Sequence, residues 1–236
     1  MKKLAILTVA ALAACASQHQ EAAKIDDSGL ARLNEDQMAP VDDARIEVGR
    51  AQDAVARGKA AEADARAQVE VAKSDKAVAE AQLKRALAER DLLKKQYAGK
   101  DALARSDESV RASQERVKAA DLKLQYLNQL VAVRETERKA AEAHVLTAQA
   151  LTEQAKYRAM KEGKAPQADV VNPGDVDHRV ASARSQEANL EKSAADQRTK
   201  AVDLYNRWQQ ADAAVRTMAQ PTNLPVPPPV SEPTSH

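Results

Sequence analysis

One group of side chains in this sequence has the types and the closeness that a metal site requires. Asp175, Asp177 and His178 follow the turn-forming run Asn172-Pro173-Gly174. Two carboxylates and an imidazole could hold a divalent cation weakly, but their spacing matches neither an EF-hand loop nor a zinc motif. Acidic residues in the first turn of a helix explain the group more simply, because they stabilise the positive end of the helix dipole. We therefore expect no metal site.

The other residues that could act in catalysis are scattered along the chain. His19, His144 and His236 lie in widely separated segments. Gly99-Lys100 and Gly163-Lys164 lack the upstream glycine and the following Ser or Thr of a phosphate-binding loop. A catalytic pocket also needs walls from several packed elements, and a narrow helical rod offers few. The sequence predicts that the protein is not an enzyme and binds no cofactor.

The composition indicates long helices. The 236 residues include 51 Ala, one Trp and no Phe, whereas a compact core of this size needs large aromatic and branched side chains. Lys and Arg number 36 and Asp and Glu 35, so the formal net charge is only +1. A nucleic-acid-binding protein needs a basic face or stacking rings, and we expect no such partner. Six Gly and a single Cys argue against collagen and a disulfide scaffold.

That single cysteine, Cys15, follows a segment typical of secretion signals. Lys2 and Lys3 precede an apolar run, residues 4–12, and small residues come next. The run is too short to span a membrane, which takes about 20 apolar residues. A basic start, a short apolar stretch and small residues at the end are typical of a signal peptide. Residues 1–14 are the predicted signal peptide.

The run Leu12-Ala13-Ala14-Cys15 resembles the lipobox of bacterial lipoproteins. The resemblance implies cleavage between Ala14 and Cys15, a diacylglyceryl group on the Cys15 thiol, and an acyl chain such as palmitate on the new amine. Several acyl chains on one residue anchor a protein stably. Ala16 and Ser17 follow, in place of the Asp that retains lipoproteins in the inner membrane of enteric bacteria. The resemblance thus implies a lipid anchor in the outer membrane, facing the periplasm.

Heptad rows dominate the chain after this anchor. We interpret residues 15–40 as the lipidated cysteine and a flexible tether ending at Pro40. From residue 41 to 165 there is no proline. One apolar row steps by seven from Val41 to Tyr97, and the row three residues later is almost all small: Ala44, Ala51, Gly58, Ala65, Ala72, Ala79, Ala86 and Leu93. Such rows form a coiled-coil seam, and small residues let the facing helix approach closely.

Near Gly99 the seven-residue spacing of the rows is interrupted, and the rows resume with a shifted phase. Basic residues before Gly99 and Asp101 just after it suggest the end of one helix and the cap of the next. Because the two halves are similar in length, residues 41–165 predict an antiparallel coiled-coil hairpin with its turn near 99–101; one continuous helix is the alternative. In the hairpin Glu62 would face Arg138, while Lys76 and Arg90 have no obvious partner.

A third helix is expected over residues 175–219, after a loop at 166–174 and with Asp175 as its cap. Its seam is apolar at eleven of thirteen positions between Val176 and Met218, and Trp208 is expected to fill the seam and not to bind a ligand. The predicted fold class is all-α: a long antiparallel hairpin with a shorter third helix packed along it and disordered ends.

Residues 220–236 hold six of the nine prolines. The run Pro-Val-Pro-Pro-Pro-Val at 225–230 favours polyproline II, a conformation that aromatic grooves bind. A disordered tail is the simpler expectation.

Anchor and rod together predict a periplasmic helical scaffold or tether with a cell-envelope protein partner. The chain is similar to the Ala-rich helical lipoproteins of Gram-negative bacteria. The alternative is an accessory component of an efflux or secretion complex that docks through the hairpin tip, residues 93–107. Periplasmic adaptors have similar hairpins, although their β-rich flanking domains have no counterpart here. Self-association through exposed seams is a third possibility.

Overall fold

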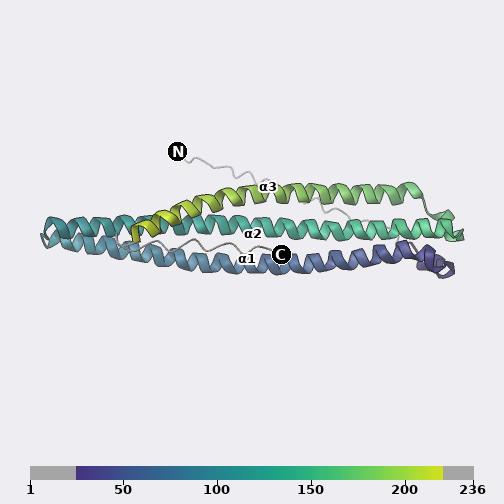
Figure 1. Cartoon of the computed structure of the whole chain (residues 1–236), viewed down its shortest axis with the longest axis horizontal. Coiled ribbons are helices and arrows are strands. Elements are labelled where there is room, and N and C mark those ends of the chain that lie inside the picture. Colours follow the sequence, from purple (N-terminus) through teal and green to yellow (C-terminus); the bar gives the residue numbers. More distant parts are fainter. Residues whose placement is uncertain (1–24, 220–236) are drawn as a thin grey trace, which may run out of the picture.

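The computed structural model describes residues 25–219, which form three long helices and two short 3-10 helices. In chain order these are η1 (Asp27–Arg32), α1 (Glu35–Lys95), α2 (Lys100–Glu162), η2 (Pro166–Val170) and α3 (Pro173–Ala219). The first two long helices form an antiparallel hairpin, and α3 returns along α2 (Figure 1). The predicted all-α hairpin with a shorter third helix is confirmed, and a single continuous helix is excluded.

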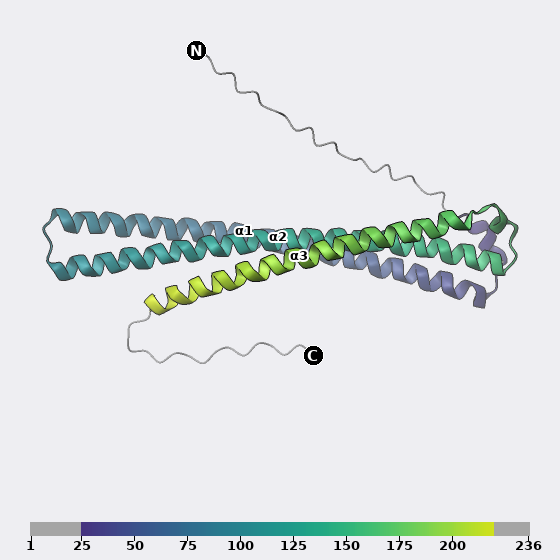
Figure 2. The same ribbon diagram turned by 90° about the horizontal axis from the view of Figure 1, so that it is seen from above.

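The helix α2 lies between the other two, so the three helices form a layer (Figures 1 and 2). Leu127 of α2 packs against Val69 and Ala72 of α1, whereas Tyr126 of α2 stacks on Trp208 of α3. The middle helix therefore has two apolar faces. The heptad rows identified the face toward α1 but not the one toward α3.

The small-residue row of α1 is the close-contact side of the hairpin. Five of its alanines are at most 8% exposed: Ala51, Ala65, Ala72, Ala79 and Ala86. At Gly58 an added Cβ would lie 3.4 Å from the Cα of Arg138, so the two helices nearly touch there. The seam predicted for α3 is likewise buried or half-buried through Val215, and only Met218 is exposed.

The first helix begins six residues earlier than predicted. The Asn34 side chain accepts a hydrogen bond from the Gln37 N–H at 2.9 Å, and the Gln37 side chain accepts one from the Asn34 N–H at 3.1 Å. This capping box sets the start of the helix ahead of Pro40, which lies inside α1. The predicted boundary at Pro40 is therefore wrong, because the helix continues through it to Val41, which is fully buried.

Part of the segment predicted to be a tether belongs to the folded rod. Ile25 and Leu30 are buried at 7% and 6% exposure, so the interpretation of residues 25–40 as a flexible tether is wrong. The remainder of that segment, the signal peptide at 1–14, Ala14, Cys15 and the tail at 220–236 lie outside the described residues.

One end of the rod, which we call the foot, holds the main apolar core. Its buried residues come from every element: Ile25, Leu30, Val41, Ala159, Met160, Ala165, Ala168 and Val176. Two glycines allow the close approach of the chain there. A Cβ on Gly29 would lie 2.5 Å from the sulfur of Met160, and one on Gly163 would overlap a methyl group of Leu33.

The third helix starts two residues earlier than expected. Pro173 is its first residue, and the Asn172 carbonyl accepts hydrogen bonds from the N–H groups of Asp175 and Val176 at 3.2 and 3.4 Å. The Asn172 side chain also accepts a hydrogen bond from Gly174 N–H at 3.0 Å. The predicted cap, Asp175, is therefore wrong, because proline suits the first helical position and a preceding Asn can fill the capping role.

The turn between α1 and α2 places a tyrosine where glycine is normally preferred. Ala98 N–H donates to the Leu93 carbonyl at 3.1 Å and Tyr97 N–H to that of Lys94 at 3.3 Å, the two bonds of a Schellman motif. Tyr97 has a φ of 54°. Gly99, with φ of −61°, caps the start of α2, so the predicted capping roles of Gly99 and Asp101 are wrong.

Replacing Tyr97 with glycine is expected to stabilise the protein by about 1 kcal/mol, because a left-handed conformation strains residues that have a Cβ. The side chain is 95% exposed, so little packing is lost. Denaturant unfolding followed by circular dichroism measures the gain. Tyr97→Ala is the matched control, since it removes the ring and keeps the strain; equal stability of the two variants would contradict this turn geometry.

Candidate functional site

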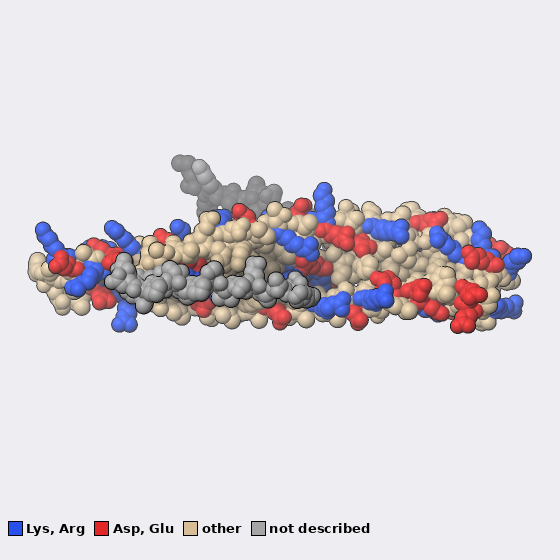
Figure 3. All heavy atoms as spheres, viewed as in Figure 1, with Lys and Arg blue, Asp and Glu red and all other residues tan. Residues whose placement is uncertain are grey.

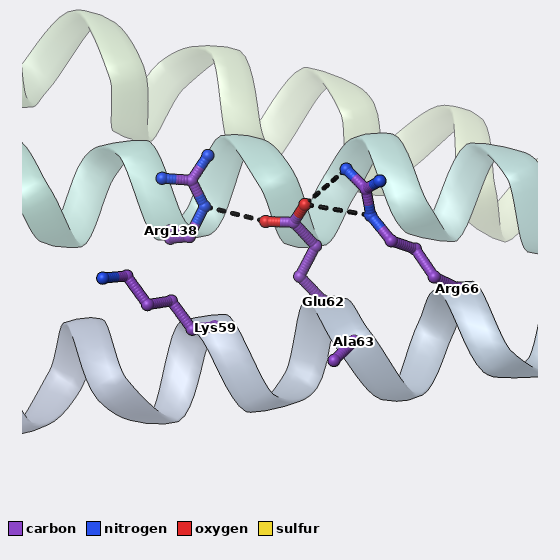
Figure 4. Close-up of a pocket in the computed structure, with 5 residues that line it drawn as sticks. All are labelled: Lys59, Glu62, Ala63, Arg66 and Arg138. Carbon is purple, nitrogen blue, oxygen red and sulfur yellow. Dashed lines mark hydrogen bonds and ion pairs between the residues drawn. The ribbon is translucent and has the colours of Figure 1, made fainter.

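The charged residues that interrupt the heptad rows pair across the hairpin. Arg138 Nε donates to Glu62 Oε2 at 2.7 Å, which confirms the predicted pair (Figure 4). Lys76 Nζ donates to Asp121 Oδ1 at 2.5 Å, and Arg90 Nε lies 3.6 Å from Asp107 Oδ1.

Sequence analysis missed these last two pairs because it compared only the seam rows, and both aspartates lie just outside them. The sequence did contain a signal for both pairs: each aspartate lies next to the seam of α2, level with its basic partner when the hairpin is folded.

Glu62 is the half-buried centre of a small cluster of charged side chains. Arg66 Nη2 lies 2.6 Å from its other carboxylate oxygen, and Arg138 also donates to Glu142 at 2.6 Å. The side chains of Glu62 and Arg138 are 12% and 22% exposed. Lys59 and Ala63 complete a shallow hollow of about 310 Å³ around them (Figure 4).

The electrostatics of this cluster suit structure better than proton transfer. Hydrogen bonds from Arg138 and Arg66 lower the pKa of Glu62, and the hydrogen bond to Glu62 raises the pKa of Arg138. A general acid or base works best with a pKa near the ambient pH, and both shifts move away from neutrality. The cluster therefore fixes the register of the hairpin, a role that polar pairs in apolar seams can perform.

Reversing the charge of Glu62 tests that role. Glu62→Arg would place a third guanidinium beside Arg66 and Arg138, so a large fall in melting temperature is expected. The double variant Glu62→Arg/Arg138→Glu should recover part of the loss, since the pair across the hairpin is restored with opposite polarity while Arg66 and Glu142 each face a like charge. Glu70→Arg is the control, because Glu70 is exposed and pairs only with the neighbouring Lys73. No recovery in the double variant would contradict the register role.

His144 of α2 connects all three long helices. Its Nδ1 lies 2.6 Å from Glu187 of α3, and its Nε2 lies 3.5 Å from Glu47 of α1. Burial lowers the pKa of His144, but the hydrogen bonds and charges of Glu187 and Glu47 outweigh burial, and the pKa is raised. When the ring is protonated, it bridges the two outer helices through Glu187 and Glu47.

Stability is expected to fall as pH rises through this raised pKa. The contribution of His144 is fully present below its unfolded value of 6.5 and is lost as the folded protein releases the proton. The ring is 40% exposed, and solvent screening reduces the effect to about 0.5 kcal/mol. Denaturant unfolding of wild type and His144→Gln, compared between about pH 6 and pH 8, measures it. Parallel pH profiles of the two proteins would show that His144 makes no such contribution.

A buried lysine fastens the N-terminal segment to the foot. Lys156 donates to Asp27 at 2.7 Å and to Glu153 at 3.1 Å, and Glu153 also accepts a hydrogen bond from the Ile25 N–H at 2.7 Å. Burial lowers the pKa of Lys156, but these two acidic partners raise it overall, so the lysine stays charged. These contacts hold Ile25 and Asp27 against α2 at the foot.

Three aromatic rings meet where α3 packs on α2. The ring centroids of Tyr126 and Trp208 are 5.8 Å apart and nearly parallel, and Tyr205 meets both edge-on at 5.3 and 5.6 Å. Trp208 is half-buried in the seam, as predicted. Sequence analysis did not identify the cluster, because Tyr126 lies on a different helix.

The acidic group at the start of α3 does not assemble a metal site. Asp177 accepts a hydrogen bond from the Gln154 side chain at 2.7 Å, and Asp175 lies in the first turn of the helix. Between residues 25 and 219, no three ligating side chains converge in a way that could hold a metal ion.

The surface shows no single dominant charge. Basic and acidic side chains alternate along the face seen in Figure 3. None of the helices between residues 25 and 219 is both long and apolar enough to cross a bilayer. Comparison of the chain with protein families, curated proteins and solved structures gave no match.

Proposed function

We propose that the protein is a lipoprotein anchored in the outer membrane that acts as a helical scaffold in the periplasm, without catalytic activity. The observation that carries this proposal is the attachment of the N-terminal segment at the foot, through Ile25, Asp27 and Lys156. In Figure 1 the foot and the hairpin turn lie at opposite ends of the rod. A lipid on Cys15 would therefore hold one end of the rod and leave the other free.

The dimensions of the chain set how this scaffold would stand. The ten residues from Cys15 to Ile25 span at most about 35 Å when extended, so the foot stays close to the bilayer. The 61 residues of α1 extend about 90 Å, which is the reach of the hairpin turn beyond the foot.

An apolar row on α1 supports a role in protein contacts. Val71, Val78 and Leu92 are 60%, 57% and 53% exposed, and their spacing in multiples of seven places them on one side of the helix, where Arg85 interrupts the row. Such a row is suited to contact a cell-envelope partner or a second copy of the chain.

Metabolic labelling with a fatty acid tests the anchor. Wild type is expected to carry the label and to sediment with outer membranes, and Cys15→Ser to carry none and to remain soluble. Ala16→Asp should keep the label and move to the inner membrane in an enteric host. Equal labelling of wild type and Cys15→Ser would contradict the lipid anchor.

A second candidate function, docking of the hairpin tip onto an efflux or secretion channel, is favoured by the length of α3. Ala211 and Ala214 of α3 lie beside Glu115 and Lys118 of α2, and α3 ends soon afterwards. The hairpin continues alone beyond this point (Figures 1 and 2). The tip is thus free to contact another protein.

Shortening the hairpin just below the tip by one heptad on each helix separates the two functions, because it withdraws the tip by about 10 Å from a channel that it would contact. Deleting residues 86–92 together with 107–113 removes Arg90 along with its partner Asp107 and keeps the register of the remaining seam. The docking function predicts that transport is lost while the protein remains folded and membrane-bound. The scaffold function predicts that the deletion leaves transport unchanged.

A further inference from the structure

The three-ring cluster of Tyr126, Tyr205 and Trp208 is open to solvent on one side. Tyr205 is 40% exposed and its neighbour Val202 is 58% exposed, and the other two rings are half-buried. The whole chain has only five aromatic residues, so three of them are concentrated at one place on the rod. Packing of a uniform alanine-rich seam does not require this.

The polar groups of the same three rings are available for binding. Between residues 25 and 219, the two phenol hydroxyls and the indole N–H donate no hydrogen bond to the protein, and none is among the buried unpaired polar atoms. Tyr and Trp combine a broad apolar face with one hydrogen-bond donor. Aromatic side chains of this kind bind polyproline II segments in peptide-recognition domains, because the carbonyl groups of such segments have no internal partners.

A matching segment follows α3 in the same chain. Residues 220–231 carry no charge, and Pro225, Pro227, Pro228 and Pro229 lie among apolar residues. Proline has no backbone N–H, so burying this segment against the rings would leave few donors unpaired.

The reach of the chain brings this segment back to the rings. Trp208 lies eleven residues before Ala219, a distance of about 17 Å along a helix. A reversal at residues 220–221 uses the first residues after the helix, and the six residues from Pro221 to Pro227 then cover about 19 Å in polyproline II conformation. The reversal would therefore set Pro227 beside Trp208, with Pro228 and Pro229 directed toward Tyr205.

We propose that residues 224–230 bind back across the rings of Tyr126, Tyr205 and Trp208 as a polyproline II segment. The proline rings pack on the aromatic faces, and their carbonyl groups accept hydrogen bonds from the indole N–H and the phenol hydroxyls. This contact covers the open side of the α2–α3 seam. It does not depend on the lipid anchor or on the scaffold role.

Trp208 is the only tryptophan, so its fluorescence reports this contact directly. The full chain is compared with two variants. One ends at Ala219, and the other is a full chain with the substitutions Pro225→Ser, Pro227→Ser, Pro228→Ser and Pro229→Ser. In both variants the emission is expected to move to longer wavelength, and quenching by acrylamide to rise about twofold, because the covered ring face returns to water. The full chain with Pro221→Ser and Pro233→Ser is the matched control, and it should behave as wild type.

A synthetic peptide of residues 220–236 distinguishes the occupants of the site. Added to the chain ending at Ala219, it should restore the wild-type emission, and added to the full chain it should change nothing. Identical emission and quenching with and without the tail would overturn the proposal. So would an equal response of both chains to the peptide, which would show that the rings are open for a segment of another protein.

Discussion

Met160→Ala is expected to lower the free energy of unfolding by about 3 kcal/mol, the usual cost of emptying a fully enclosed site. Met160 is 0% exposed and lies at the centre of the foot, where both 3-10 helices and all three long helices meet. The thioether contacts the backbone at Gly29 closely, so the surrounding chain has little freedom to collapse into the cavity. Urea unfolding followed by circular dichroism measures the loss.

The chain contains a matched control for this change. Met218 is the same residue type, on a helix, with 53% exposure, and Met218→Ala should change stability by at most about 0.5 kcal/mol. Met160→Leu, which nearly conserves volume, should cost less than about 1.5 kcal/mol. Similar small losses for Met160→Ala and Met218→Ala would contradict a tightly packed foot.

Ala72→Leu is expected to destabilise the hairpin by about 2 kcal/mol, because the added atoms have no space between α1 and α2. Ala72 is 1% exposed and packs with Val69 and Leu127. Alanine and leucine have similar helix propensities, so the loss reports packing. The melting temperature and the denaturant midpoint of the purified variant measure it.

Ala77→Leu supplies the comparison, since Ala77 is exposed on the same helix. It should leave stability unchanged within about 0.5 kcal/mol. If leucine were tolerated equally at both positions, the two helices could not be as close as the alanine row requires.

Much of the rod follows from local patterns in the sequence. The alanine row places α1 against α2, and the Glu62–Arg138 pair sets the register, because a seam repeats every seven residues and shows its contact side wherever the helix is long. The same pattern could not show that α2 has a second partner. Tyr126, which meets Trp208, belongs to no row that was traced, and the neighbour of a helix face is decided by tertiary packing.

The foot was the part least predictable from sequence. Its residues come from five separate elements, and no local pattern relates Ile25 to Met160 or Val176. Pro40 concealed the start of α1, because proline usually ends a helix and the Asn34–Gln37 capping box lies on its other side. The prediction that Cys15 carries a lipid depends on a short local motif that lies outside the described residues. The fold of residues 25–219 therefore does not test it.

The foot and the lipid together define the proposed scaffold. Lys156 and Glu153 hold the segment that leads to the anchor, and His144 holds the outer helices to α2 above it. The hairpin turn lies at the far end, with Tyr97 almost fully exposed. In the proposed scaffold, the length of the rod is the surface that contacts other molecules.

The height of each end of the rod above a membrane tests this arrangement most directly. Two single variants are prepared as lipidated protein, Ser28→Cys in the foot and Tyr97→Cys in the turn, and each is labelled with a donor dye. The lipid blocks the Cys15 thiol, so only the new cysteine reacts. The labelled protein is then bound to vesicles that contain an acceptor lipid. We predict strong energy transfer from position 28 and little from position 97, because α1 separates the two by about 90 Å. Equal transfer from both positions would contradict a rod that stands on its foot.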